Sequence, residues 1–498
     1  MITKYLKENK YLILMIVLSS VLVFFGLGNK TLTLDEVATI NISSNWDKMV
    51  NILYYQEANM WLYYILIHLI LFFGKTEFLV RFLSAFSAVL TVPVFYGLVD
   101  NLVGKRIAKI ATPLFIFNFY FVFYAQTARS YSFTLFLSSL ALYFFIRLVK
   151  GKSKLNIFVY SILSSMMVYS YLLAALPIAS EYLSILILNK REKLKEIVGA
   201  GLFTFILLIP LFLSKAIHSD VIDWLQKPPL VHLPFGFIML GSDSIFVSFI
   251  AATVISIYLW SKRNILIKKS FERFVLVLLL LLTIFPIVFT YLFSLFVKPL
   301  YQPQAFNTSL PAFTILLAMA IDNLKTYGKF VYKSIFFLIL LFMGLRLFTW
   351  FFGPNYLYIN NVVVDNVNSR DWKAAAKYIK ENKRSKQVVV FYSYYIHYPI
   401  DYYFNQIPGQ NPNEVEISTA PYAIGGGTKL PEPNIKLLDS FANKYEEVDL
   451  VQSYNDLDWL GRKQQSEQIE KEIKKNFILV SDKKMNQIDI EIFKNKKS

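Results

Sequence analysis

Residues 11–40 read YLILMIVLSSVLVFFGLGNKTLTLDEVATI, and this stretch decides the class of fold. Residues 11–28 carry no charge, and a helix of about 20 mostly apolar residues is what crosses the core of a bilayer. The run therefore predicts a membrane span. Three lysines precede it and no small-residue cleavage site follows, so we expect a retained anchor helix with a cytoplasmic N-terminus. Asp35 and Glu36 then stand where the span opens into water.

The composition of the whole chain is that of a membrane protein. Hydrophobic residues make up 55% and charged residues 17% of its 498 residues, which excludes an ordinary soluble protein. Apolar stretches recur until about residue 352, and after that charged residues interleave with short apolar runs. Helical and strand patterns alternate in this later part. We therefore expect a transmembrane domain over 1–352 and a soluble α/β domain over 353–498.

The formal charge of +17 reflects membrane topology rather than a nucleic-acid partner. The basic residues gather in short loops between apolar stretches, where the positive-inside rule places cytoplasmic Lys and Arg. These loops read GKRIAK, RLVKGKSK, NKREKLK, SKRNILIKK and NLKTYGKFVYK. The absence of cysteine excludes disulfides and thiolate chemistry, and the four histidines show no metal-ligand spacing.

The number of spans follows from requiring all five basic loops to share one side. Residues 60–74 are apolar but short, and treating them as a juxtamembrane surface helix satisfies that requirement. The first external loop then runs over 29–78, and about eleven spans place the C-terminal domain outside the plasma membrane with Asp35. The expected spans after 11–28 are 79–102, 107–124, 131–149, 155–172, 173–189, 197–214, 245–260, 274–297, 305–321 and 334–352.

Several polar residues are expected at the outer rim of these spans. A carboxylate there can take a proton from an attacking hydroxyl, and a guanidinium or a divalent cation can neutralise a departing phosphate. We expect Asp35 and Glu36 to point to opposite sides of an extended segment. The other rim residues are Glu57, Arg81, Gln126 and Arg129.

The sequence resembles a known family in the stretches that carry these residues. LDE at 34–36, the segment EANMWLYYILIHLILFFGKTEFLVRFLSAFSAVLTVPVFYGL at 57–98 and FVFYAQTARSYS at 121–132 are similar to the membrane-embedded GT-C glycosyltransferases. These include protein O-mannosyltransferases and lipid A aminoarabinose transferases. A weaker similarity continues through KPLYQPQAFNTSLPAF at 298–313 and RDWKAAAKYIKENKRSKQVVVFYSYYIHYPIDYYF at 370–404.

The resemblance implies an inverting transfer of a sugar from a polyprenyl-phosphate donor to a hydroxyl of a protein, lipid or glycan acceptor. It makes Asp35 the candidate base and Glu36 its companion. The expected cofactor is a divalent metal ion, and no other is expected. The expected donor-phosphate contacts are Arg129, Lys298, Arg81 and Lys215. The expected acceptor or sugar contacts are Glu57, Gln126, Trp61, Tyr301 and Gln304, and the expected metal ligands are Asp35 and Glu57.

The chain also departs from the family pattern. Thr127 stands where many relatives have a carboxylate, Asn59 and Met60 replace a Pro-Pro pair, and Gln304 and Ala305 replace an Arg-Tyr pair. Two alternatives therefore stay open: a transporter or polymer-export protein, and a catalytically silent relative that binds glycan.

Three charged residues lie in or beside apolar stretches. Glu181 either lines the donor cavity or finds a partner inside the helix bundle, because an unpaired charge there is costly. We expect Arg346 to snorkel to the membrane surface. Asp243 fits a headgroup contact or a helix N-cap equally well.

Overall fold

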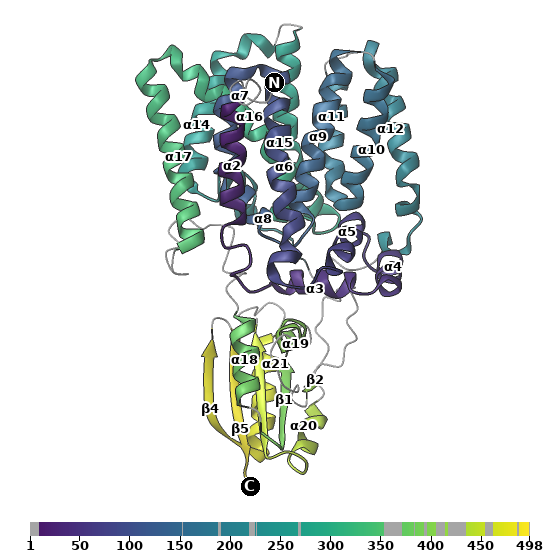
Figure 1. Ribbon diagram of the computed structural model, residues 1–498, viewed down its shortest axis with the longest axis vertical. Coiled ribbons are helices and arrows are strands. Elements are labelled where there is room, and N and C mark those ends of the chain that lie inside the picture. Colours follow the sequence, from purple (N-terminus) through teal and green to yellow (C-terminus); the bar gives the residue numbers. More distant parts are fainter. Residues whose placement is uncertain are drawn as a thin grey trace. The chain divides into compact units, whose positions relative to one another are not determined.

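The computed structural model describes residues 9–151, 153–187, 191–218, 225, 227–266, 270–352, 371–382, 384–392, 396–404, 414–416, 435–453, 462–485 and 488–497. The chain divides into two compact units (Figure 1). The helical unit takes Met1–Leu27, Ser43–Ser219 and Leu225–Asp365. The α/β unit takes Asn366–Ser498 together with Gly28–Ile42 and Asp220–Trp224, so the segment that carries Asp35 belongs with the C-terminal residues.

The helical unit combines long helices, most of which run roughly parallel to one another (Figure 1), with several shorter helices that do not. They are α2 (Lys10–Phe24), α4 (Trp46–Tyr55), α5 (Trp61–Leu71), α6 (Glu77–Val103), α7 (Lys105–Ile116), α8 (Phe119–Ala125), α9 (Tyr131–Lys150), α10 (Lys154–Ser170), α11 (Ala175–Ile187), α12 (Arg191–Phe212), α13 (Phe235–Leu240), α14 (Ile245–Ser261), α15 (Phe271–Phe296), α16 (Leu310–Asn323) and α17 (Lys329–Phe352). The 3₁₀ turns used below are η2 (Lys215–His218), η5 (Pro303–Ser309) and η6 (Leu324–Thr326).

The chain is a polytopic membrane protein. Within the described residues, six helices are long and apolar enough to cross a bilayer, and two bent helix pairs raise the number to eight. Shorter apolar helices cover Lys10–Phe24, Trp61–Leu71 and Leu172–Leu186. The predicted surface helix is α5, whose 11 residues rise only about 16 Å.

Small side chains let the central helices approach closely. α6 packs against α9, α7 and α2, and its buried residues include many Ser, Ala and Thr. Such residues at helix interfaces bring backbones together where lipid offers no hydrophobic driving force. The buried small residues of α6 are Ser84, Ala85, Ser87, Ala88 and Thr91.

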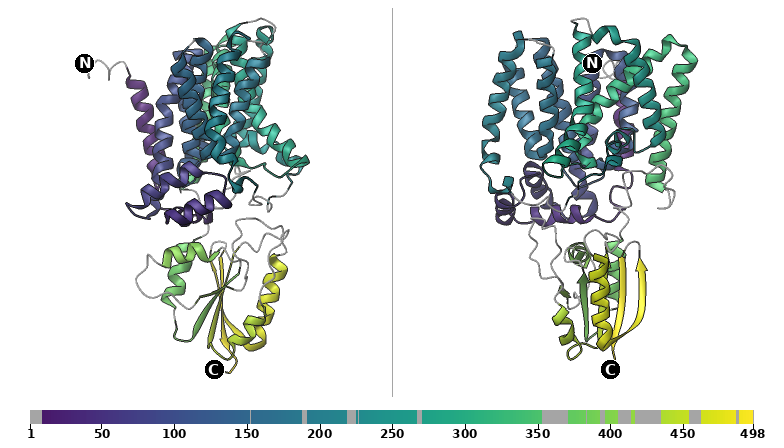
Figure 2. Two further views of the ribbon diagram at one scale, coloured as in Figure 1. Left: turned by 90° about the vertical axis from the view of Figure 1, so that its right-hand side faces the viewer. Right: turned by 180° about the vertical axis from the view of Figure 1, so that it is seen from behind.

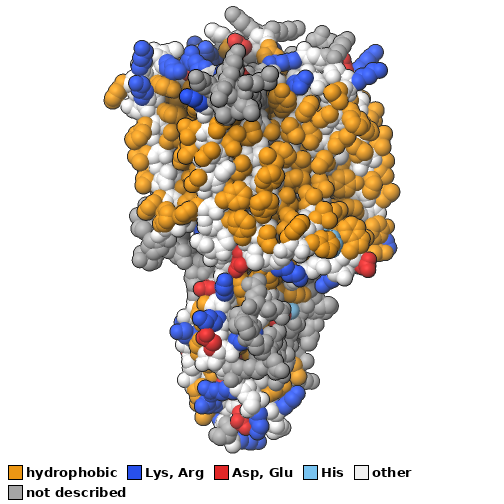
Figure 3. Space-filling view, in the orientation of Figure 1, with side chains coloured by type: hydrophobic (Ala, Val, Ile, Leu, Met, Phe, Trp, Pro, Cys, Tyr) orange, Lys and Arg blue, Asp and Glu red, His pale blue; other side chains and the backbone are white. Residues whose placement is uncertain are grey.

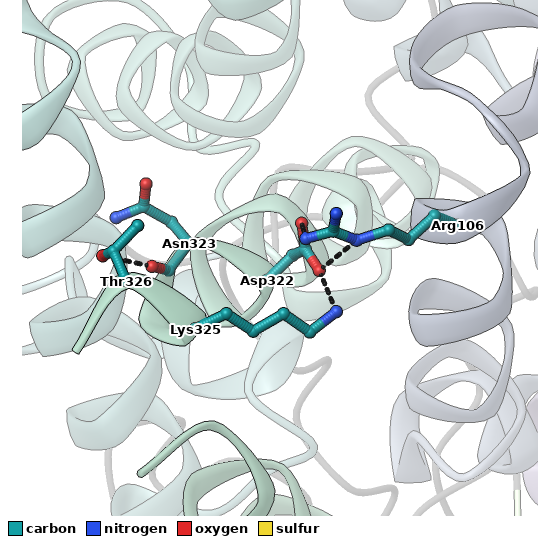
Figure 4. A network of polar contacts seen from close by, with 5 residues as sticks. All are labelled: Arg106, Asp322, Asn323, Lys325 and Thr326. Carbon is teal, nitrogen blue, oxygen red and sulfur yellow. Dashed lines mark hydrogen bonds and ion pairs between the residues drawn. The ribbon is translucent and has the colours of Figure 1, made fainter. Parts of the chain in front are cut away.

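Basic loops gather at one end of the helical unit. Arg106, in the first turn of α7, donates from Nε to Asp322 Oδ1 at 2.8 Å, and Lys325 in η6 donates to the same carboxylate at 2.5 Å. Figure 4 shows the two cations converging on Asp322 from different elements. Tyr11 at the start of α2 donates to the carbonyl of Lys109 at 2.6 Å. In Figure 3, Lys and Arg side chains line the upper edge of the broad hydrophobic surface of this unit.

The α/β unit is a mixed five-stranded sheet with helices on both faces (Figure 2). Its strand order is β2-β1-β3-β5-β4, in which β1 pairs in parallel with β2 and β3, and β5 pairs antiparallel with β3 and β4. The strands are β1 (Gln387–Tyr392), β2 (Glu414–Glu416), β3 (Glu447–Ser453), β4 (Phe477–Met485) and β5 (Ile488–Asn495). The predicted small α/β domain is confirmed.

Alternating strand residues feed two hydrophobic cores. One face carries Val389 and Val451 against α18 (Trp372–Glu381) and α19 (His397–Phe404). The other carries Val388 and Val448 against α20 (Ile435–Phe441) and α21 (Arg462–Asn476). Because side chains alternate along a strand, each buried strand supplies both cores.

A buried acid in this sheet makes its stability depend on pH. Burial, and then the charge of Glu447, raises the pKa of Asp449 from its ordinary 3.8 to about 7. Gln387 donates a hydrogen bond to Asp449, and Arg384 forms an ion pair with Glu447. The folded state therefore holds the Asp449 proton more tightly than the unfolded chain. This contribution to stability is complete below about pH 4 and is lost as the pH rises to about 7.

We predict that Asp449→Asn removes this dependence, because an amide stays neutral at every pH. Relative to the unchanged protein, the variant should gain about 1–4 kcal/mol more at pH 8 than at pH 5. Thermal unfolding of the full chain, followed by circular dichroism at both pH values, measures the difference. An equal effect at the two pH values would show that Asp449 does not titrate as described.

Candidate functional site

Asp35 and Glu36 lie in the first turn of a helix, α3 (Leu34–Ser43). The predicted extended segment is wrong, because Thr33 and Glu36 form a capping box. Thr33 N donates to Glu36 Oε2 at 2.8 Å, and Glu36 N donates to Thr33 Oγ1 at 3.3 Å. These bonds satisfy amides that the first turn of a helix leaves unpaired. Glu36 is only 1% exposed, so its carboxylate holds the start of α3.

Asp35 presents its carboxylate to solvent. Its side chain is exposed and makes no hydrogen bond or ion pair within the described residues, while its carbonyl accepts from Thr39 Oγ1 at 2.9 Å. The partial positive charge at a helix N-terminus favours a carboxylate there. Leu32 N donates to the hydroxyl of Tyr403 on α19 at 2.8 Å, which fixes the segment before α3 to the α/β unit.

We predict that Glu36→Ala destabilises the protein by about 0.5–2 kcal/mol, because the bond from Thr33 N to the Glu36 carboxylate is lost while the bond from the backbone N of residue 36 to Thr33 Oγ1 stays. Glu36→Gln should cost less, since the amide oxygen can still accept from Thr33 N. Thermal unfolding in detergent compares the two variants. If Ala and Gln destabilise equally, the cap is not what Glu36 provides.

Arg81 and Gln126 hold the end of α2 through its main chain. Arg81 Nη1 donates to the carbonyl of Leu27 at 3.0 Å, and Gln126 Nε2 donates to the carbonyls of Val23 and Phe25 at 3.0 and 2.8 Å. Gln126 Oε1 accepts from Trp350 Nε1 at 3.0 Å. Both side chains are buried. They position the point at which the chain leaves the helical unit toward Asp35, at the end of α2 opposite Tyr11.

Arg129 lies among tyrosines at this same end. Its Nη1 donates to the Tyr64 hydroxyl at 3.4 Å, and its carbonyl accepts from Ser84 Oγ at 3.0 Å. The ring of Tyr171 packs edge-on to that of Tyr131, two residues after Arg129, at 5.5 Å. Arg129 is thus a half-buried cation with phenols around it.

Glu57 and Trp61 belong to the turn that begins α5. Glu57 Oε1 accepts from Asn59 N at 2.9 Å, and the Trp61 indole donates to the Glu57 carbonyl at 2.9 Å. Asn59 Oδ1 accepts from Leu172 N at 3.0 Å, so this residue bridges the turn to the end of α10. Met60 adopts a left-handed conformation with φ of 65°.

The remaining predicted residues lie elsewhere in the helical unit. The hydroxyl of Tyr301 lies 2.9 Å from the carbonyls of His232 and Leu233, and accepts from Gly236 N at 3.2 Å. It therefore holds the loop before α13. Gln304 bonds to the side chain of Gln302, Lys298 follows the end of α15 half-buried, and Lys215 Nζ lies 5.2 Å from the centre of the Tyr55 ring.

The described residues do not form a metal site. Among them, no three His, Asp or Glu side chains come together in a group that could hold an ion. Of the two predicted ligands, Asp35 belongs to the α/β unit and Glu57 to the helical unit.

A buried ion pair was missed by the sequence analysis. Arg346 Nη2 lies 2.9 Å from Asp243 Oδ2, and the two side chains are 3% and 0% exposed. The predicted snorkelling of Arg346 is therefore wrong: its guanidinium stays inside, 3.5 Å from the centre of the Phe119 ring. Two opposite charges in apolar stretches were the signal that could have suggested the pair. Glu181 likewise accepts from Tyr160 at 2.5 Å inside the bundle.

The sequence itself matches no family model and no curated protein. The structure is similar to ArnT from Cupriavidus metallidurans in the apo state, with a TM-score of 0.64 and 11% identity over 98% of each chain. ArnT bound to undecaprenyl phosphate gives a TM-score of 0.63 at 11% identity, over 97% of this chain and 98% of that one.

An archaeal protein shares the same architecture. The oligosaccharyltransferase AglB from Archaeoglobus fulgidus, in complex with an inhibitory peptide and a dolichol-phosphate, gives a TM-score of 0.51 at 12% identity. The match covers 90% of this chain and 69% of that one. At such identities a likeness establishes architecture. The chain has the GT-C fold of membrane glycosyltransferases, as its sequence predicted.

Proposed function

We propose that the protein is an inverting glycosyltransferase that moves a sugar from a polyprenyl-phosphate donor to an acceptor hydroxyl. The observation that carries this proposal is the carboxylate of Asp35, exposed at the start of α3 in a chain with the GT-C fold. ArnT and AglB with that fold have been solved with undecaprenyl phosphate and with a dolichol-phosphate. Release of polyprenyl phosphate by the purified protein tests the function.

The chemistry needs one base and one stabilised leaving group. Asp35 accepts the proton of the acceptor hydroxyl while the acceptor oxygen forms a bond to the anomeric carbon. The bond between that carbon and the phosphate oxygen breaks, and its electron pair leaves with the polyprenyl phosphate. A single displacement from the face opposite the phosphate inverts the anomeric centre. A positioned base of this kind contributes about 10² to 10⁴ in rate.

Arg129 is the best-supported group for the departing phosphate. Arginine presents several N–H donors in a planar fork that suits phosphate, and the bond to Tyr64 orients this one. Arg81 is less suited, because its guanidinium is buried against the main chain at the end of α2. Lys298 and Lys215 remain candidate secondary contacts for the lipid phosphate.

We predict that Arg129→Ala lowers kcat/KM for the donor by about 10²-fold, the scale of one lost transition-state contact. Arg129→Lys should lose less, because it keeps the charge without the fork. Initial rates at varied donor concentration measure both variants. Tyr64→Phe removes the hydrogen bond that orients Arg129 but leaves the cation, so it should cost less than Arg129→Ala. If the rates of Arg129→Ala equal those of the unchanged protein, Arg129 does not bind the departing phosphate.

The proposal includes a topology, in which the N-terminus is cytoplasmic and the C-terminal domain over 353–498 lies outside the plasma membrane. It is supported by the basic loops, which gather at the end of the helical unit opposite Arg81, Gln126 and Arg129, because the positive-inside rule places such loops in the cytoplasm. A reporter enzyme that works only outside the cytoplasm should therefore show activity when it is fused to the C-terminus. Activity of a cytoplasm-only reporter would contradict this orientation.

Transport is less well supported than transfer. Transporters place functional charges near the membrane midplane, whereas Glu181 and Arg346 each have a partner within the bundle. Thr127, at the position of a carboxylate in relatives, donates to the Phe123 carbonyl of its own helical turn at 2.8 Å. The proposed reaction needs no carboxylate at position 127, so the presence of Thr127 there is not an argument for a catalytically silent protein.

A further inference from the structure

The helix α4 presents an aromatic and polar surface, in which only Tyr55, among the described residues, touches a residue of the proposed reaction, Lys215. Met49, Ile52 and Leu53 face inward, and the helix contacts α5 and η2. Figure 1 shows it beside α5 at the end of the helical unit. Its exposed side forms an open groove of about 290 Å³, lined by Trp46, Asp47, Val50, Asn51, Tyr54 and Tyr55.

The rings of this groove are held by their neighbours. Trp46 is 49% exposed and packs on His68 at 5.4 Å, while His68 Nδ1 lies 2.6 Å from the carbonyl of Ser43. Tyr54 and Tyr55 meet edge to face at 4.8 Å. Rings fixed in this way lose little conformational freedom when a ligand packs against them.

Two polar side chains stand between the rings with their hydrogen-bonding capacity unused. Asp47 and Asn51 lie one helical turn apart and are exposed. Neither side chain makes a hydrogen bond or an ion pair in the part of the chain that the structure describes. Together they offer about four acceptor lone-pair sites on the carboxylate, and the carbonyl acceptor and N–H donors of the amide.

This combination selects one kind of ligand. Aromatic rings can cover the C–H face of a pyranose, and a carboxylate and an amide can bond its hydroxyls. Aromatic side chains also line membrane–water interfaces, which makes insertion into lipid the competing occupant. Asp47, in the first turn of α4, and Asn51 add hydrogen-bonding groups that a saccharide uses and an acyl chain does not. The volume is near the lower limit of small-molecule sites, which suits one or two sugar rings of a longer chain.

We propose that the α4 groove binds a saccharide segment of a glycan acceptor. The identity of that glycan as acceptor rests on the proposed function, but the binding itself does not. Trp46 follows Asp35 by eleven residues of sequence, through α3 and a two-residue linker. A saccharide bound in the α4 groove narrows the acceptor class to a glycan or a glycosylated polymer, rather than an unmodified peptide.

The test is direct binding of soluble oligosaccharides to the purified full-length protein in detergent. Malto-, cello- and chito-oligosaccharides of two to six units serve as probes, and isothermal titration gives the affinity. Trp46→Ala and Asn51→Ala should each lower the affinity for the probe at least about tenfold. The matched control is Trp260→Ala, at another exposed tryptophan on α14, and it should bind like the unchanged protein. If no probe binds, or if the control loses as much affinity as Trp46→Ala, the proposal is overturned.

A second measurement separates this proposal from the proposed function and from lipid insertion. An Asp35→Asn protein that transfers no sugar should still bind the probe with unchanged affinity. Bromine-labelled lipids should quench the fluorescence of the unchanged protein and of Trp46→Phe to the same extent in proteoliposomes. A clear loss of quenching in Trp46→Phe would place Trp46 in the bilayer and overturn the glycan site.

Discussion

Asp35→Asn protein should fold and insert normally and transfer sugar at least about 10²-fold more slowly than the unchanged protein. The amide has nearly the shape of the carboxylate but cannot accept the proton of the acceptor hydroxyl. Folding should be unaffected, because the Asp35 side chain makes no hydrogen bond within the described residues and the cap of α3 depends on Thr33 and Glu36. The readout is release of polyprenyl phosphate from a labelled donor.

Two comparisons make this prediction specific. Asp100→Asn removes an exposed carboxylate at the basic end of α6 and should leave the rate unchanged. Unfolding temperatures of the Asp35 variant and the unchanged protein should be close, because no packing is lost and an exposed carboxylate at a helix N-terminus contributes only about 0.3–1 kcal/mol. An Asp35→Asn protein that retains the full rate would assign the base to another residue.

Arg346→Met should destabilise the protein by about 3–5 kcal/mol, the largest stability effect expected from a single change. The substitution keeps an apolar side chain of similar length but leaves Asp243, which is fully buried, without its guanidinium. A buried charge without a partner costs far more than the pair contributes. Chemical denaturation in detergent, followed by tryptophan fluorescence, measures the loss.

A double-mutant cycle separates the pair from the packing around it. Asp243→Asn combined with Arg346→Met should recover much of the stability, because no unpaired charge remains. Asn also tolerates the left-handed backbone of this position, where φ is 51°. As a control, Arg106→Met breaks an ion pair whose arginine is 64% exposed and should cost at most about 1 kcal/mol. If the free energy of unfolding of Arg346→Met lies within about 1 kcal/mol of that of the unchanged protein, this account of the pair is contradicted.

The architecture could be predicted because its signals are local. The charge-free run at 11–28 corresponds to α2, and the short apolar run at 60–74 contains α5. The pattern of RDWKAAAKYIKEN became α18, with Trp372, Ala375, Ala376 and Ile379 buried on one face. In α18 the spacing of apolar residues determines which face is buried, whereas for α2 and α5 the signal is the uninterrupted apolar run itself.

The site could be predicted only in part, because its contacts join distant segments. Arg81 bonds to a carbonyl 54 positions away and Arg346 to a carboxylate 103 positions away, and no local pattern encodes either partner. The helix α3 is a different case. Thr33 and Glu36 have the spacing of a capping box, which predicts the start of a helix. Asp35 and Glu36 were instead interpreted as a catalytic pair in an extended segment.

The central claim is that this chain performs an inverting transfer from a polyprenyl-phosphate sugar. It is tested most directly by incubating the purified protein with a donor of known anomeric configuration and a soluble oligosaccharide, and determining the configuration of the new linkage by NMR. The account predicts a product of opposite configuration, formed by the unchanged protein and not by Asp35→Asn. A product with retained configuration, or an intact donor that merely crosses the liposome membrane, would contradict it.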